Sequence, residues 1–241
     1  MTGHVANAQS PPVTEDCDRV ALSIIISYDG TTHDDDALAL GRMLAVADVS
    51  LSLAYVRHSH EYDPRREEIA QHDAERRLEQ GATWLGNPDI ARHVVFNPAT
   101  SAGLAGLAAE LGVGLIVFGS DYRTPPGRVE PGMAAQQMLT GGTVAIGVAA
   151  AGLRTNADAP IKTVSVPGGG EDGAVRETAE SLAAAVGAEI VEGGSSADLI
   201  LVGSQSGAPT GHIALGGATR ARLDSARGSV IVLPRDTPLA F

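Results

Sequence analysis

Short apolar runs alternate along this chain with longer segments whose apolar residues recur at helical spacing. The runs are too short for helices and several are rich in β-branched residues, which is typical of buried strands. We expect strands over residues 20–27, 50–56, 93–96, 114–119, 143–149, 161–166, 189–191, 199–203 and 229–233. We expect helices over residues 34–47, 65–85, 101–111, 132–139 and 175–186, and another after residue 216. Strands that alternate with helices pair in parallel through right-handed crossovers, so the pattern predicts an α/β fold.

One pattern of apolar residues and glycines occurs twice. Each copy begins with an apolar run that ends in Gly-Ser, and the two runs are Leu115-Ile116-Val117-Phe118-Gly119-Ser120 and Leu199-Ile200-Leu201-Val202-Gly203-Ser204. In both copies a further glycine, Gly132 or Gly216, follows 13 positions after the first. A strand, a glycine-containing loop and a helix start, in that order, commonly present a ligand to a helix N-terminus. The repeat therefore predicts two related units.

The two units differ in length. Asp29 to Gly119 spans 90 positions, whereas Pro167 to Gly203 spans only 36, so 54 positions of the first unit have no counterpart in the second. We therefore divide the chain into a disordered tail over residues 1–18, a complete domain over 19–150, a linker over 151–160 and a truncated domain over 161–241.

The amino-acid composition and net charge of the chain exclude several kinds of partner and site. Aromatic residues make up 3% of the chain, so the core must be built from small aliphatic side chains, as suits a layered α/β protein. The formal net charge of −12 disfavours a nucleic-acid partner, because neutralising phosphates requires a basic face. Cys17 is the only cysteine, which excludes an intrachain disulfide and a cysteine-based zinc site. Without a signal peptide or a long apolar run, we expect a cytoplasmic protein with no membrane partner.

The second copy of the repeat resembles the late motif of the universal stress protein family, in which Gly, two residues, Gly, nine residues and Gly precede Ser or Thr. The matching segment runs from Gly216 through Gly228 and Ser229 to Leu233, and residues 132–139 with 143–148 fit the motif more loosely. The resemblance implies an open five-stranded parallel sheet flanked by helices, Rossmann-like in order, followed by a shortened copy. It also implies that the units pair through strands 143–149 and 229–233 as an internal pseudo-dimer, with a homodimer as a further expectation.

The resemblance implies an adenine-nucleotide site, for ATP or AMP. In the family's terms, the first-strand Asp29 would meet the nucleoside, Val56 would line the adenine pocket, and Gly119 and Gly132 would frame the phosphates, since glycines let backbone amides approach phosphate. The full set of candidate binding residues is Asp29, Gly30, Val56, Phe118, Gly119, Tyr122, Gly132 and Met133 in the first unit and Gly203, Ser206, Gly216 and Gly217 in the second.

This chain departs from the family pattern at several of these positions. Tyr122 stands where the family has the second motif glycine, and Met133 stands where it has Ser or Thr. In the second unit, Ser206 and Gly217 hold those positions, and Pro167 replaces the first-strand Asp. Each lost charge-assisted hydrogen bond costs roughly 1.5–3 kcal/mol, so the departures predict weak or lost nucleotide binding.

Other side chains could take part in binding. Asp34, Asp35 and Asp36 could hold magnesium, but capping and dipole complementation of the first helix explain them as well. His58 and His60 with Asp63 could form a metal cluster or a solvated loop. The arginines that could meet a bound anion, or lie in solvent, are Arg123, Arg128 and Arg220.

Residues 168–173 resemble, imperfectly, the pyrophosphate loop of adenylating enzymes, although Gly168 and Gly173 stand where that loop has serines. A glycine-rich turn with Asp172 as helix cap explains them equally.

Three candidate functions therefore remain for the chain. The first is a non-catalytic stress or regulatory module with weak or lost adenine-nucleotide binding. The second is a ligand-free dimerisation or partner-binding scaffold, and the third is an adenylating enzyme. Beyond Asp29 we find no general base or metal-holding group, so we expect no catalytic residue and at most slow ATP hydrolysis.

Overall fold

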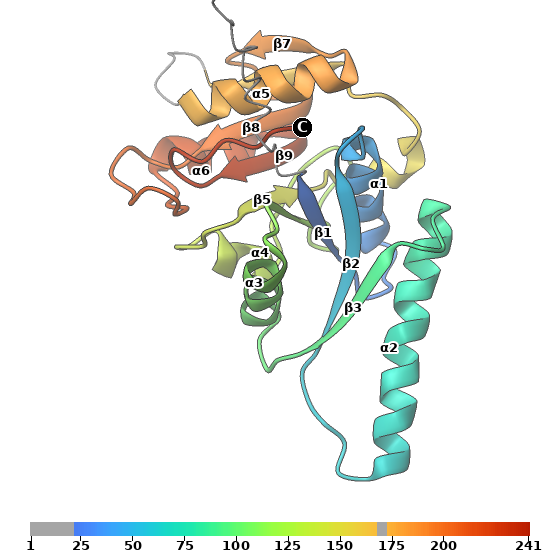
Figure 1. Ribbon diagram of the computed structural model, residues 1–241. Coiled ribbons are helices and arrows are strands. Elements are labelled where there is room, and N and C mark those ends of the chain that lie inside the picture. The colour runs from blue at the N-terminus through green and yellow to red at the C-terminus, as the bar shows by residue number, and fades with distance from the viewer. Residues whose placement is uncertain (1–21, 168–172) are drawn as a thin grey trace, which may run out of the picture.

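The computed structural model describes residues 22–167 and 173–241, so the tail expected at residues 1–18 lies outside the described residues. In the described part, nine strands form one sheet in the order β3-β2-β1-β4-β5-β9-β8-β6-β7 (Figure 1). The strands are β1 Ser23–Ser27, β2 Ser50–Arg57, β3 Ala91–Phe96, β4 Leu115–Phe118, β5 Ala145–Val148, β6 Thr163–Val166, β7 Glu189–Glu192, β8 Ser196–Gly203 and β9 Arg227–Leu233. The helices are α1 Asp34–Leu44, α2 Pro64–Leu85, α3 Thr100–Leu111, α4 Met133–Met138, α5 Gly173–Val186 and α6 Gly217–Ser225, with a 3-10 turn η1 at Leu153–Asn156. The predicted α/β fold is confirmed.

Helices cover both faces of the sheet, and the strands are buried on both sides. Ile24 and Ile26 of β1 join a buried cluster that includes residues of α1, α2 and α5. Ile25, between them, joins a second cluster that includes residues of α3, α4 and α6. All three isoleucines are fully buried, which explains why these strands read in the sequence as continuous apolar runs rather than as alternating ones.

The sheet is continuous across the two units. Strands β3-β2-β1-β4-β5 are parallel to one another, and β5 then pairs antiparallel with β9, with Gly147 opposite Ile231. On the far side, the order β7-β6-β8-β9 repeats the order β2-β1-β4-β5. The described chain between β7 and β8 holds no equivalent of α2, β3 or α3, which matches the 54 positions that lack a counterpart. Because β5 and β9 are both interior strands, neither is open to pairing with another chain.

The segment 151–160, expected to be a linker, packs against α1 instead. Asp36 of α1 is 1% exposed and accepts hydrogen bonds from the backbone N–H groups of Gly152 and Arg154. It also forms an ion pair with the Arg154 guanidinium at 2.7 Å. Asp34, Asp35 and Asp36 lie in the first turn of α1, as dipole complementation predicts. None of them is the capping residue, because the residue before the helix is His33, whose side chain makes no capping bond. Asp36 joins α1 to the segment that follows β5.

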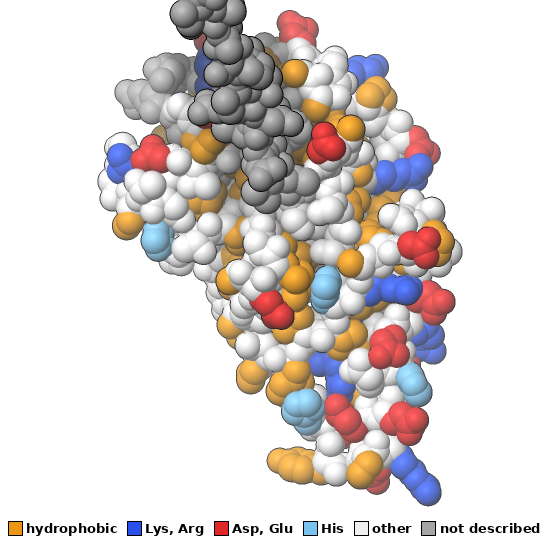
Figure 2. Space-filling model, viewed as in Figure 1, with side chains coloured by type: hydrophobic (Ala, Val, Ile, Leu, Met, Phe, Trp, Pro, Cys, Tyr) orange, Lys and Arg blue, Asp and Glu red, His pale blue; other side chains and the backbone are white. Residues whose placement is uncertain are grey.

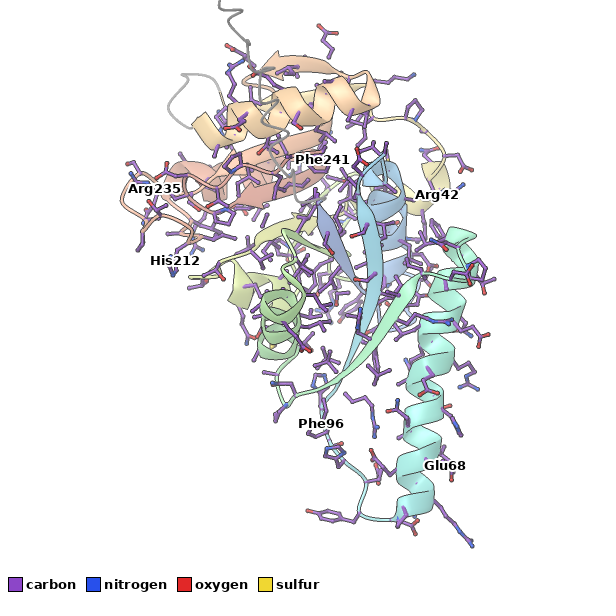
Figure 3. The ribbon with its side chains drawn as sticks, viewed as in Figure 1. Arg42, Glu68, Phe96, His212, Arg235 and Phe241 are labelled. Atoms are coloured by element: carbon purple, nitrogen blue, oxygen red, sulfur yellow. The ribbon has the colours of Figure 1, made fainter. Side chains whose placement is uncertain are left out.

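Helix α2 extends beyond the sheet as an arm (Figure 1). Its buried residues, Ala74, Leu78, Gly81 and Ala82, lie between the middle of the helix and its C-terminal end, and charged side chains of both signs line its exposed surface (Figure 2). The arm is held by Arg57 of β2, which donates to both carboxylate oxygens of Glu67 at 2.9 Å. That contact lowers the pKa of Glu67 to about 2. Phe96 at the end of β3 and Glu68 of α2 lie at the same end of the molecule, remote from Arg235 in the other unit (Figure 3).

Candidate functional site

A cavity of about 680 Å³ lies at the carboxyl ends of β1, β2 and β4. The position is the one at which open α/β sheets bind ligands, because the loops that leave neighbouring strands diverge there. Of the candidate residues in the first unit, the cavity is lined by Asp29, Val56, Phe118, Gly119, Tyr122, Gly132 and Met133. Gly30 does not line it. Its φ of +88° turns the chain after β1, next to the Arg77 side chain.

The carboxyl groups of Asp29 and Asp34 lie next to each other at the edge of this cavity. Asp34 accepts hydrogen bonds from the Asp29 N–H and the Thr31 hydroxyl, each at 3.0 Å. Burial and the adjacent Asp29 carboxyl raise the pKa of Asp34 to about 8. Burial acts on Asp29 as well, but hydrogen bonds from Asp34 and Thr31 outweigh it and hold the Asp29 pKa below its ordinary value. At neutral pH, Asp29 is therefore the charged member of the pair and a ready acceptor for hydroxyl groups.

Arg77 of α2 supplies positive charge beside Asp29, and the sequence did not point to it. Its guanidinium donates to the Asp29 carbonyl at 2.6 Å and lies 5.6 Å from the Tyr55 ring centroid. Together with His33 and Asp34, Arg77 lines the cavity. No local pattern marks a residue in the middle of a charged helix as part of a site, because only the packing of α2 against β2 brings it there.

Gly119, in the loop after β4, lies against the start of α1. A Cβ at Gly119 would lie 2.4 Å from the His33 carbonyl oxygen, so glycine is needed there for close contact with the start of α1. Nothing lies within 4 Å of a Cβ at Gly132, which directly precedes α4 and lines the cavity. The expectation that both glycines frame a phosphate therefore fits Gly132 better than Gly119.

Tyr122 and Met133 border the cavity without filling it. The Tyr122 side chain is 60% exposed, its ring centroid lies 6.3 Å from that of His33, and the Arg123 guanidinium lies 4.9 Å from it. Met133 is 78% exposed in the first turn of α4. Tyr122, which stands where the family has a glycine, therefore does not close the cavity.

A second cavity, of about 330 Å³, lies at the equivalent place in the second unit, at the ends of β6 and β8. Gly203 and Ser206 line it, together with Pro167. Gly216 and Gly217 are not in its lining: Gly216 precedes α6 in the same extended conformation in which Gly132 precedes α4, and Gly217 is the first residue of that helix. The two cavities therefore use the same part of the repeated unit with different side chains.

The remaining candidates form no site of their own. Arg128 donates to the carbonyls of Asp224 and Ser225 at the end of α6, and Arg220 lines a separate small cavity beside that helix. His58 contacts the Asn97 carbonyl, and His60 stacks on Phe96. Among the described residues, no group of three His, Cys, Asp or Glu side chains is placed to hold a metal ion.

Two further expectations concern other parts of the chain. In the loop proposed for adenylation, residues 168–172 lie outside the described residues, and Gly173 begins α5. In the described ranges, no helix has the length and apolar character needed to cross a membrane.

Comparison with solved structures identifies the fold. The chain is similar to a protein of unknown function from Pseudomonas aeruginosa PAO1, with a TM-score of 0.57 and 14% identity over 89% of this chain and 92% of the other. It is similar to a universal stress protein from Archaeoglobus fulgidus DSM 4304, with a TM-score of 0.53 and 13% identity over 89% of this chain and 99% of the other. The chain therefore has the fold of the universal stress proteins, as the resemblance predicted.

A weaker likeness, to a universal stress protein in complex with cAMP, has a TM-score of 0.31 and 22% identity, and covers 41% of this chain and 72% of the other. It says nothing of the ligands of this chain. No protein-family model and no curated protein matches the sequence.

Proposed function

We propose that this chain, which has the fold of the universal stress proteins, is a non-catalytic regulatory module that binds an adenine nucleotide weakly in the first cavity. The observation that supports the proposal is the cavity itself, about 680 Å³ between Asp29 and Gly132 at the carboxyl ends of β1, β2 and β4. This volume lies within the range of small-molecule and cofactor sites.

The lining offers a partner for each part of a nucleotide. Val56 and Phe118 are buried apolar side chains against which a base can pack. The Asp29 carboxylate can accept hydrogen bonds from ribose hydroxyls. Gly132 leaves the start of α4 open to a phosphate, where free backbone N–H groups favour an anion.

Several features limit the affinity. Helix α4 has only six residues, and Met133 in its first turn has no hydroxyl to offer a phosphate. One oxygen of the Asp29 carboxylate already accepts the Thr31 N–H at 3.0 Å. The net charge of −12 opposes an anionic ligand at long range. We therefore propose a dissociation constant in the high micromolar to millimolar range.

The proposal includes the organisation of the chain and its role. We propose a complete unit over residues 19–150 and a shortened one over 161–241, held as an internal pseudo-dimer by the pairing of β5 with β9. The role that fits this assembly is a cytoplasmic stress response through a protein partner, without ATP hydrolysis.

Isothermal titration calorimetry with ATP, AMP and cAMP tests the binding. We expect heat of binding for the full chain, and binding at least tenfold weaker for Asp29→Ala, because a charge-assisted hydrogen bond is lost. Asp89→Ala removes the same charge from an exposed loop and is the matched control. If no nucleotide gives heat at millimolar concentration, or if both variants lose binding equally, the nucleotide proposal is wrong.

A ligand-free scaffold is the second candidate. Tyr122 and Met133 favour it, because they occupy positions at which the family's motif serves phosphate. In that case β3 and β7, the edges of the nine-stranded sheet, are the strands still open to a partner. Absence of nucleotide binding together with an intact fold would support this function.

A further inference from the structure

Another cavity, of about 330 Å³, lies between α4 and α6, where the two units meet. Gly132 and Gly216 are equivalent and lie 84 positions apart, so residues with that spacing correspond between the units. We call this space the junction cavity, because both units contribute the same positions to it. The equivalent pairs in its lining are Pro131 and Leu215, Gln136 and Arg220, Leu139 and Leu223, and Thr140 and Asp224.

The equivalent positions differ in charge. The first unit contributes neutral Gln136 and Thr140, whereas the second contributes charged Arg220 and Asp224 at the same places. Glu130, in the loop before α4, adds a second carboxyl group to the lining. The junction cavity therefore presents one guanidinium and two carboxylates, and its two halves are chemically different.

The charged groups of the lining are not engaged with one another. Among the described residues, no hydrogen bond or ion pair involves the side chains of Glu130, Arg220 or Asp224. Arg220 and Asp224 are four residues apart on α6, a spacing that places two Cβ atoms about 5–6 Å apart on one face of a helix. Nearby, Arg128 donates to the carbonyls of Asp224 and Ser225. With Arg128 counted, two cations balance two anions around the cavity.

Aliphatic side chains form the rest of the lining. Val129, Leu139 and Leu223 are 7%, 2% and 6% exposed, and Leu215 is half-buried. None of the described residues that line the cavity is aromatic. The exposed charged groups thus surround an apolar floor, an arrangement that suits a small molecule with charged groups at one end and an aliphatic group at the other.

We propose that the junction cavity binds a free α-amino acid with an aliphatic side chain, such as leucine. The ligand's carboxylate pairs with Arg220 through two parallel hydrogen bonds. Its ammonium group lies between Asp224 and Glu130, and its side chain covers Leu139 and Leu223. The two charged groups of an α-amino acid are attached to one carbon, so they can meet an arginine and an aspartate that lie one helical turn apart.

The balance of charge and the size of the cavity agree with this ligand. An amino acid at neutral pH carries no net charge, as does the set of charged groups around the cavity. A volume of about 330 Å³ is at the lower end of the range for ligand sites. Exposed ion pairs contribute little each, so we expect millimolar affinity. This proposal goes beyond the proposed function and does not rest on nucleotide binding.

Backbone amide NMR of the isotopically labelled full chain, titrated with L-leucine, tests the proposal. We expect the signals of Glu130, Leu215 and Leu223 to shift with one millimolar or tighter dissociation constant. The comparison ligands are 4-methylpentanoate, which lacks the ammonium group, and 3-methylbutylamine, which lacks the carboxylate. Each should bind at least fivefold more weakly than leucine, because one of the two charged contacts is missing.

Matched variants distinguish the junction cavity from other binding surfaces. Arg220→Gln should weaken leucine binding at least fivefold, whereas Arg222→Gln, which removes the same charge from the side of α6 that lines the second cavity, should leave it within twofold. If Arg220→Gln fails to fold, Glu130→Gln should weaken binding and the exposed Glu110→Gln should not. Asp29→Ala, in the first cavity, should leave leucine binding unchanged.

Four results would overturn the proposal. They are no binding of leucine by the wild type, equal affinity for leucine and either comparison ligand, equal losses within a matched pair of variants, and loss of leucine binding in Asp29→Ala. Absence of ATP binding with leucine binding intact would contradict only the proposed function of the first cavity.

Discussion

Ser120 and Ser204 make the same two hydrogen bonds at equivalent points of the two units. The Ser120 hydroxyl donates to the Ala149 carbonyl at 2.6 Å, and the Ser204 hydroxyl donates to the Leu233 carbonyl at 2.9 Å. In each case the acceptor is 29 residues further along the chain, and the same hydroxyl accepts a backbone N–H ten residues along at 3.3 Å. The repeat seen in the sequence thus extends to the hydrogen bonds that shape each loop.

This equivalence predicts similar losses of stability in the two units. Ser120→Ala and Ser204→Ala should each lower the free energy of unfolding by about 1–2 kcal/mol, with the larger loss at the more buried Ser120. Urea unfolding measures both changes. Ser225→Ala, which removes an exposed local hydrogen bond, should cost less than about 0.5 kcal/mol. A neutral result at one serine with a large loss at the other would show that the loops are not equivalent.

The Asp36–Arg154 ion pair predicts a larger loss. Asp36→Ala should lower the free energy of unfolding by about 3 kcal/mol, because it leaves two backbone N–H groups and a guanidinium without their acceptor. The matched control is Asp158→Ala, which breaks the exposed ion pair with Arg42 at 2.6 Å and should cost less than about 1 kcal/mol. Comparable losses in the two variants would contradict the role given to Asp36.

We expect a side chain at position 119 to clash with its surroundings. Gly119→Ala should destabilise the fold by about 2 kcal/mol, because its Cβ would meet the backbone carbonyl of His33 rather than a flexible side chain. Gly106→Ala, in the middle of α3 with open space around it, should stabilise the protein by up to about 1 kcal/mol. Thermal melts distinguish the two. A neutral Gly119→Ala would show that the contact with His33 is not tight.

The pKa of Asp34 predicts how stability depends on pH. With a pKa of about 8 in the folded chain and about 3.8 in the unfolded chain, Asp34 keeps a proton on folding that the unfolded chain has lost. The unfolding free energy therefore decreases as pH rises from about 4 to 8, and is unaffected by this group above that range. The lowered pKa of Asp29 acts only below its ordinary value, outside this window.

Asp34→Asn should remove that dependence. Relative to wild type, the variant should gain on the order of 2 kcal/mol between pH 5 and pH 9, after allowing for solvent screening of the carboxyl group. Urea unfolding across this range measures the difference. Asp73→Asn, which removes an exposed carboxylate paired with Arg76, should follow the wild-type curve. Parallel curves for wild type and Asp34→Asn would contradict the raised pKa.

The sequence was sufficient to predict the strands, the helices and the repeat, because those depend on local periodicity and on glycine spacing. The family resemblance led us to expect pairing between strands 143–149 and 229–233, and β5 does pair with β9. The antiparallel direction of that pairing and the packing of residues 151–160 against α1 were not predicted. Both depend on contacts between residues far apart in the chain, such as the Asp36–Arg154 pair, 118 positions apart.

The candidate site was predicted in part. Asp29, Val56 and Gly132 could be placed because each lies near or after the end of a strand or just before a helix, and the carboxyl ends of parallel strands meet at one edge of the sheet. Arg77 could not be placed, because it lies within a helix whose rotation about its axis only tertiary packing fixes. Gly119 lines the cavity, but its close contact with the His33 backbone could not be predicted from the sequence.

Backbone amide NMR of the isotopically labelled full chain, titrated with ATP, tests most directly whether the first cavity is a nucleotide site. We expect the signals of Asp29, Val56, Gly119 and Gly132 to shift together with one dissociation constant, and the shifts to be lost in Asp29→Ala. Unchanged spectra at millimolar ATP, or shifts confined to residues outside that cavity, would contradict it.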